Sequence, residues 1–255
     1  LSPLAAQKHI NMTFYYADHV PKHVIGDALR FKHILTNLIS NAIKFTPDGE
    51  IIVRVRIEHE DLEHSLLHFS VQDSGIGLSG TDRKKLFESF SQGDASVTRQ
   101  FGGTGLGLAI SKQLVSLMHG QIGFEDNQER APTEKGSTFW FTANFAIEKE
   151  EEIAHPHFNN LQVVSYLAHP ATAHVLRHYL ENYDAQHIEA QSILDLFSRL
   201  NQLEQSDNTW LIVDHSGDTE AMLKEIRTRY TGNLAVYGYH MLLDPNDNLL
   251  FLRDV

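Results

Sequence analysis

The segment Gly102-Gly103-Thr104-Gly105-Leu106-Gly107-Leu108 constrains this chain most, because it runs directly into a helical pattern. Each glycine near a helix start weakens the helix by about 1 kcal/mol relative to alanine. A bound anion would offset that cost, since free backbone N–H groups at a helix N-terminus attract anions and glycine lets a polyphosphate lie against them. A flexible turn explains the glycines but not the helix that begins among them. The segment therefore predicts phosphate binding.

A second segment predicts an amphipathic helix that begins at a cap, Asp27, and runs to about Phe45. Its apolar residues fall on one broad arc: Phe31, Ile34, Leu35, Leu38, Ile39, Ala42 and Ile43. The opposite arc carries Asn37, Asn41 and Lys44. Such a stripe alone is typical of a solvated helix face. It would also suit hydrated Mg²⁺ with attached phosphates, because Mg²⁺ takes hard oxygen ligands and Lys binds phosphate as a point charge.

The run Asp73-Ser74-Gly75-Ile76-Gly77 follows a predicted strand. Alternation places Asp73 on the same face as Leu67, Phe69 and Val71, which we expect to be buried. A buried carboxylate is costly unless it is paired, and an amino group on a ligand base would pair it. Gly75 and Gly77 would let the backbone bend around a planar ring. A turn with an Asp cap remains the alternative.

The long segment between these motifs contains Leu86-Phe87-Glu88-Ser89-Phe90-Ser91-Gln92. Long loops in compact domains are usually functional lids or disordered. Phe87 and Phe90 would anchor such a lid, and Arg99 near its far end could reach phosphate. Local core packing is the alternative for the two phenylalanines, and it is compatible with the lid.

The order of predicted elements indicates two domains. In the first, strands at 51–57, 66–73, 121–125 and 137–146 and helices at 27–45 and about 104–118 predict an α+β two-layer sandwich. Residues 148–160 lack periodicity, carry a charge run and contain Pro156, so they are interpreted as a linker. The first domain therefore spans 1–147 and the second, smaller α/β domain spans 161–255.

Composition excludes several classes of function. The formal net charge of −12 would repel a nucleic-acid backbone. The chain has no cysteine, so disulfides and thiolate metal sites are excluded, which fits a reducing cytoplasm. Its sixteen histidines lack metal-ligand spacing and are assigned no metal. No apolar run is long enough to span a membrane.

In this order and spacing, the helix stripe, the Asp73 motif, the phenylalanine segment and the glycine segment resemble the N, G1, F and G2 boxes of the histidine-kinase catalytic domain, a branch of the GHKL ATPases with the Bergerat ATP-binding fold. The stretch from Val24-Ile25-Gly26-Asp27 through Gly103 is most similar to the BarA/GacS type of hybrid sensor kinase.

The resemblance implies ATP and Mg²⁺ as cofactors. Asn41 would coordinate Mg²⁺, and Asn37, Lys44 and Arg99 would act in catalysis at the phosphates. The residues implied to line the rest of the nucleotide site are Phe45, Asp73, Gly75, Gly77, Phe87, Phe90, Gly103, Thr104, Gly105, Leu106, Gly107 and, through water near the adenine, Thr138.

One residue separates this chain from the hydrolysing relatives Hsp90, gyrase and MutL, which carry a water-activating Glu where this chain has Asn37. An amide cannot act as a general base. The resemblance therefore implies a histidine kinase that holds ATP until a histidine on a separate dimerisation domain, expected upstream of Leu1, is brought to it. It further implies a phosphorelay with downstream receiver and phosphotransfer domains and a response regulator. The whole protein is expected to be a homodimeric bacterial inner-membrane sensor with this part in the cytoplasm, and the chain alone to be a monomer.

The second domain resembles a receiver, with strands at 161–168, 185–190, 209–214, 233–239 and about 248–252 and helices at 170–183, 191–204 and 218–230. Asp214 stands at the acceptor place. Leu167-Ala168 replaces the acidic pair that holds Mg²⁺, and no Lys follows the fifth strand. We therefore interpret it as a pseudo-receiver, in which Asp214 caps a turn.

Two alternatives remain open. The first domain could hydrolyse ATP as a conformational clamp like the Hsp90 group. The chain could also be a regulatory binding module, an interpretation favoured for the second domain.

Overall fold

The chain forms two compact units in a computed structural model, Leu1–Glu151 and Glu152–Val255. The division falls inside the expected linker. The structure describes residues 1–77, 86–88, 106–127, 135–147, 158, 160–203, 209–214, 219–229, 234–239 and 252–253. Within these residues no helix combines the length and apolar character that crossing a membrane requires.

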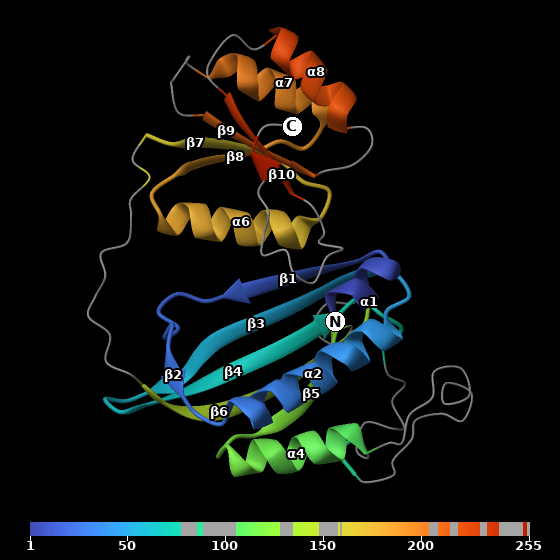
Figure 1. Cartoon of the computed structure of the whole chain (residues 1–255), viewed down its shortest axis with the longest axis vertical. Coiled ribbons are helices and arrows are strands. Elements are labelled where there is room, and N and C mark those ends of the chain that lie inside the picture. The colour runs from blue at the N-terminus through green and yellow to red at the C-terminus, as the bar shows by residue number, and fades with distance from the viewer. Residues whose placement is uncertain are drawn as a thin grey trace. The chain divides into compact units, whose positions relative to one another are not determined.

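The first unit is a helix layer on one face of a mixed sheet (Figure 1). Its helices are α1 (Ser2–Gln7), α2 (Ala28–Phe45) and α4 (Gly107–Leu117). Its strands are β1 (Ile10–Tyr16), β2 (Val24–Ile25), β3 (Gly49–Glu60), β4 (His64–Asp73), β5 (Ile122–Asp126) and β6 (Ser137–Ile147). The strand order is β1-β3-β4-β6-β2, and β5 also pairs with β6. The two-layer sandwich predicted for this part of the chain is confirmed.

Helix α2 begins and ends for local reasons. The side chain of Asp27 accepts a hydrogen bond of 2.9 Å from the backbone N–H of Arg30, which satisfies one of the free donors of the first turn. The helix ends at Phe45 because Thr46 precedes a proline, and a residue before proline is disfavoured in the helical region. Both predicted ends of this helix are confirmed.

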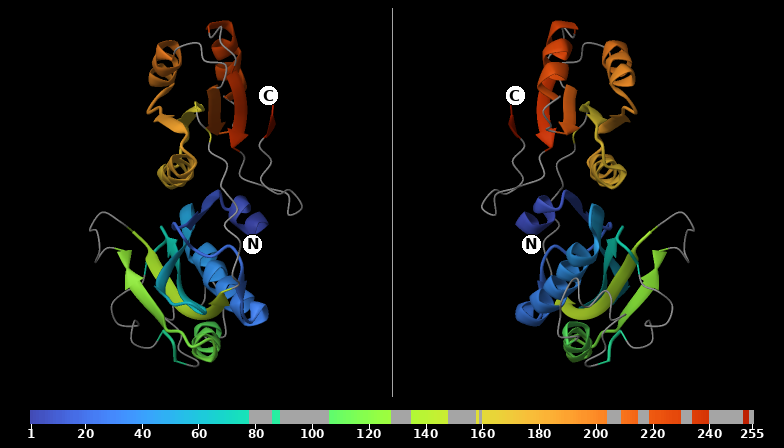
Figure 2. Two further views of the ribbon diagram at one scale, coloured as in Figure 1. Left: turned by 90° about the vertical axis from the view of Figure 1, so that its left-hand side faces the viewer. Right: turned by 90° about the vertical axis from the view of Figure 1, so that its right-hand side faces the viewer.

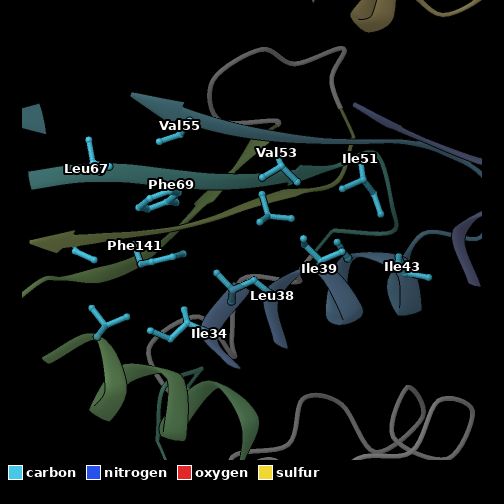
Figure 3. Packing of buried hydrophobic residues seen from close by; sticks show 14 of the residues in the cluster. Ile34, Leu38, Ile39, Ile43, Ile51, Val53, Val55, Leu67, Phe69 and Phe141 are labelled. Carbon is cyan, nitrogen blue, oxygen red and sulfur yellow. The ribbon is translucent and has the colours of Figure 1, made fainter. Parts of the chain in front are cut away.

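The core of the first unit lies between α2 and the sheet. Residues of α2, β3, β4 and β6 meet there, as Figure 3 shows. Because side chains alternate along a strand, pairing Val53 with Val71 and Val55 with Phe69 puts the apolar residues of both strands on the helix-facing side. The rings of Phe69 and Phe141 stack there with centroids 4.9 Å apart.

The second unit is a sheet covered on both faces (Figures 1 and 2). Its strands are β7 (Gln162–Tyr166), β8 (Gln186–Glu189), β9 (Thr209–Asp214), β10 (Leu234–Tyr239) and β11 (Leu252–Arg253). Its helices are α6 (Pro170–Asn182), α7 (Ile193–Gln202) and α8 (Thr219–Arg229). Val163 packs into a cluster with Leu180 of α6, whereas Val164 packs with Leu196 of α7 and Ile226 of α8. Successive residues of β7 thus face opposite layers, as in buried parallel sheets.

The strand order of the second sheet is β8-β7-β9-β10-β11. Numbered along the unit, this is 2-1-3-4-5, the order of flavodoxin-like sheets. The first four strands are parallel, but β11 runs antiparallel to β10. The last strand is therefore a departure from that fold.

Candidate nucleotide site

Asp73 is the most deeply buried carboxylate of the first unit's described residues, at 3% exposed. Its Oδ1 atom accepts from the backbone N–H groups of Gly75, at 2.9 Å, and Ser137, at 3.3 Å. Its Oδ2 atom accepts from the Ser137 hydroxyl at 2.7 Å. Burial raises the pKa of Asp73, and the three hydrogen bonds oppose that rise. The predicted burial of Asp73 is confirmed.

Ser137 is not among the predicted site residues, whereas Thr138 was predicted to act near the adenine. The hydroxyl of Thr138 donates a 2.7 Å hydrogen bond to the side-chain oxygen of Asn127. The amide nitrogen of Asn127 in turn donates to the carbonyls of Asp73 and Lys135, both at 3.0 Å. Asn127 therefore links the end of β5 to the end of β4 at Asp73 and to the start of β6 at Lys135 and Thr138.

Two glycines around Asp73 allow close backbone approach. A Cβ atom on Gly136, where φ is +88°, would lie 1.9 Å from the carbonyl oxygen of Asp73. A Cβ on Gly75 would lie 2.4 Å from the carbonyl oxygen of Phe45, at the end of α2. That carbonyl also accepts from the N–H of Ile76 at 3.3 Å. The Asp73 motif and the end of α2 are therefore in direct contact. Gly77 has a φ of +69°, in the left-handed region.

The polar stripe of α2 lies beside α4. Asn37 donates from Nδ2 to the Ser111 hydroxyl at 2.8 Å. Asn41, one turn later, is half-buried, and its side chain makes no hydrogen bond to any described residue. The Lys44 ammonium lies 4.9 Å from the centre of the Phe45 ring. Phe45 is half-buried.

The glycine segment is described only from Leu106 onward. Leu106 is the N-terminal cap residue of α4, and Gly107 is its first helical residue. A Cβ atom on Gly107 would lie 2.5 Å from Oδ1 of Asn37, so this glycine lets α4 approach α2. Phe87 is half-buried. The remaining predicted site residues lie outside the described residues: Phe90, Arg99, Gly103, Thr104 and Gly105.

These contacts bring the Asp73 motif and the start of α4 to two different places along α2. The backbone of Gly75 and Ile76, which follows Asp73, meets the end of α2 at Phe45. Asn37 meets the start of α4 at Gly107. Such an arrangement offers a buried acceptor at one end and a helix N-terminus with neutral amides at the other.

In the second unit, Asp214 stands at the end of β9, beside the end of β7. Its carboxylate accepts a hydrogen bond from the backbone N–H of Ala168. Ala168 therefore lies at the strand end next to Asp214.

Comparison with known proteins shows what the first unit is similar to. Residues 26–147 match the family described as "Histidine kinase-, DNA gyrase B-, and HSP90-like ATPase". The sensor protein GacS of Pseudomonas syringae pv. syringae is 41% identical over 200 residues, which cover 78% of this chain and 22% of GacS. The signal transduction histidine-protein kinase BarA of Escherichia coli K12 is 44% identical over 142 residues, which cover 55% of this chain and 15% of BarA. This chain thus spans about a fifth of the length of GacS.

A solved structure has a similar fold. The crystal structure of full-length ShkA in complex with AMPPNP aligns with a TM-score of 0.65 at 21% identity. It covers 92% of this chain, and the alignment takes up 50% of ShkA.

Proposed function

We propose that this chain is the ATP-binding catalytic part of a hybrid sensor histidine kinase. Residues 26–147 belong to the histidine kinase-, DNA gyrase B- and HSP90-like ATPase family. The chain is also homologous to the hybrid histidine kinases GacS and BarA. It transfers the γ-phosphate of ATP to a histidine on a dimerisation domain of the same kinase. The observation that carries this proposal is the buried carboxylate of Asp73, which is fixed by Gly75 and Ser137 at the end of a strand.

Asp73 binds the base. A buried carboxylate that receives only local hydrogen bonds gains most from a further donor, and the exocyclic amino group of adenine is such a donor. Ser137 holds the carboxylate in one orientation, while Asn127 holds the backbone behind it. Gly75 and Gly77 have no side chains that would fill the space proposed for the base.

The α2 stripe binds the phosphates and the metal. The Asn41 amide oxygen is a hard ligand, and no described residue forms a hydrogen bond with it. Mg²⁺ commonly takes one or two protein oxygens, and phosphate and water complete its coordination shell. The residues present therefore fit the ion, with Asn41 holding it, and the ion would neutralise phosphate charge. Lys44 adds a positive charge close to Phe45.

The chain's own residues mainly position the reactants. An imidazole nitrogen of the acceptor histidine bonds to the γ-phosphorus as the bond to the β–γ bridging oxygen breaks and ADP leaves. Asn37 cannot take a proton from water, and its amide hydrogen already serves Ser111. We therefore expect slow hydrolysis, which disfavours the alternative of an Hsp90-like clamp.

Titration calorimetry with Mg-ATP tests binding. We expect saturable binding by the wild-type chain, and an absence of binding would overturn the proposal.

Steady-state phosphate release is expected to be very slow, and rapid release would support the clamp. Transfer is tested by adding a separately produced dimerisation domain of a GacS-type kinase and radiolabelled ATP, with a His→Ala version of that domain as the control.

For the second unit, the proposal is a receiver-like regulatory or docking module that accepts no phosphate. Its strand order supports the receiver-like fold. The GacS alignment is longer than the first unit, so it extends into the second. Asp214 accepts from the N–H of Ala168 where an acidic pair would hold Mg²⁺, and one carboxylate makes a poor site for that ion. Incubation with acetyl phosphate and Mg²⁺ is expected to add no mass, and an adduct lost in Asp214→Asn would contradict this.

The proposed partners follow from the kinase function. They are ATP and ADP, the dimerisation domain, further receiver and phosphotransfer domains, and a response regulator. The whole kinase is proposed to be a homodimer in a bacterial inner membrane with this part in the cytoplasm.

The regulatory role of the second unit is tested by deleting residues 161–255 from the longer protein. Unchanged autophosphorylation and partner binding would contradict that role.

A further inference from the structure

The side chain of Lys8, the residue that caps the end of α1, contacts the end of α2. Its Nζ atom donates to the carbonyl oxygens of Ile43 at 2.7 Å, Lys44 at 3.2 Å and Thr46 at 3.4 Å. The last carbonyls of a helix have no partner within the helix and carry partial negative charge. One ammonium with three donors therefore satisfies several of them together.

These carbonyls belong to the turn that carries two proposed nucleotide contacts. The ammonium of Lys44 and the ring of Phe45 project from that turn. Lys8 bonds to the carbonyls of Lys44 and Thr46, which flank Phe45 in the sequence. The Phe45 carbonyl instead accepts from the N–H of Ile76 in the Asp73 motif. The turn is thus held by Lys8 and by the Asp73 motif through different carbonyls.

Lys8 is itself held by packed backbone. It lies between α1 and β1, and Ile10 of β1 pairs with Gly49 of β3. Ala5 and Ile10 are buried in the same core as α2. Lys8 lies outside the matched family region, residues 26–147. A segment before that region therefore supplies a direct contact to the end of α2, which carries residues of the proposed nucleotide site.

We propose that Lys8 is a positioning residue for the nucleotide site. It touches no nucleotide itself. It fixes the last turn of α2 so that Lys44 faces the phosphates and Phe45 faces the base. This inference rests on the proposed function. A helix-capping lysine with only a stabilising role is the competing explanation, and it makes a different prediction for binding.

The test compares ATP affinity with stability in the full chain. Lys8→Met removes the charge and the donors but keeps the length, and Lys8→Arg keeps both. Val55→Ala is the matched control, because it removes core volume at a position paired with Phe69, away from the α2 end. Each variant is titrated with Mg-ATP well below its unfolding midpoint.

We expect Lys8→Met to weaken ATP binding about tenfold, equivalent to about 1.4 kcal/mol. Lys8→Arg should restore most of the affinity for ATP. Val55→Ala should lower the stability of the chain without changing its affinity for ATP. Equal affinity in Lys8→Met and Val55→Ala would overturn the inference while leaving the proposed function intact. Failure of the wild-type chain to bind ATP would instead overturn the proposed function.

If Lys8→Met does not fold, Lys8→Gln, which keeps a shorter neutral donor, replaces it. In that variant, hydrogen exchange of the Ile76 amide gives a second measurement, since this amide bonds to the Phe45 carbonyl. Faster exchange than in Val55→Ala at matched stability supports positioning. Unchanged exchange together with unchanged affinity contradicts it.

Discussion

Nδ2 of Asn37 donates a 2.8 Å hydrogen bond to the hydroxyl of Ser111, joining the α2 stripe to the helix that follows the glycine segment. Oδ1 of the same amide faces the Cα of Gly107 so closely that a methyl group there would lie 2.5 Å away. Asn37 is therefore part of the packing between α2 and α4. Gly107 serves this helix contact in addition to its proposed role at the phosphates.

Ser111→Ala is expected to destabilise the first unit by about 1 kcal/mol, because a partly buried amide donor loses its partner. Urea unfolding measures this change. Ser111→Thr, which keeps the hydroxyl, is the control. A stability equal to wild type in Ser111→Ala would show that water replaces the hydroxyl without cost.

Gly107→Ala should push the Asn37 amide away from Ser111 and weaken Mg-ATP binding. Its effect on stability should be small, since alanine favours the helix by about 1 kcal/mol over glycine. Calorimetry and urea unfolding of the same variant separate the two effects. Unchanged binding would mean that the approach of α4 to Asn37 is unimportant for the nucleotide.

Asp73→Asn should weaken ATP binding by about 1–3 kcal/mol, because an acceptor that meets the adenine amino group is partly converted into a donor. The variant amide would also face the Ser137 hydroxyl and the Gly75 N–H, which are donors in the native protein. Titration with ATP and GTP measures the loss of selectivity. Retained preference for ATP would remove Asp73 from the base site.

Asn41→Ala should abolish Mg-dependent phosphoryl transfer while leaving the fold intact, since the Asn41 side chain has no hydrogen-bond partner among the described residues. Transfer to the added dimerisation domain and circular dichroism are measured on the same sample. Transfer at the wild-type rate would refute the ligand role.

The second unit should lose stability as the pH falls below the usual histidine pKa of about 6.5. Burial, and then the nearby Arg177, lower the pKa of His187, which pairs with the buried Ser165 at 2.8 Å. The unfolded chain therefore binds a proton more readily than the folded one, and this stabilisation is present above the unfolded pKa and lost as the pH falls through the folded pKa.

His187→Gln, which cannot titrate, isolates this effect. The chain has two tryptophans, so in a Trp140→Phe background the fluorescence of Trp210 reports on the second unit alone. We expect urea midpoints to fall less in His187→Gln than in its parent between about pH 7.5 and about pH 5.5. Parallel falls in both proteins would exclude His187 as the cause.

Local patterns predicted the elements that carry the Asp73 and α2 motifs. The cap at Asp27 and the end at Phe45 both match α2, because caps and the residue before proline act over a few positions. The burial of Asp73 followed from alternation along one strand. The same alternation could have identified Ser137, which shares its parity with the core residues Phe139 and Phe141 of β6.

Other parts depend on contacts that no local pattern encodes. No local pattern predicted an element at residues 10–16, yet they form β1, whose partner β3 lies beyond α2 in the chain. Asn127 follows a short strand, and nothing around it in the sequence indicates that its amide bonds to Asp73. The direction of β11 was likewise unpredictable, because antiparallel pairing at a sheet edge depends on the path of the preceding chain.

The parallel pairing of β1 with β3 has a consequence for the order of folding. The β3–β4 hairpin closes through a short turn, whereas β1 must wait for α2 to cross over before it can pair. Contacts that close longer loops pay more entropy before they gain energy, so they tend to form later. We expect β1 to dock after the hairpin and α2 have assembled, and the competence to bind ATP to appear late during refolding.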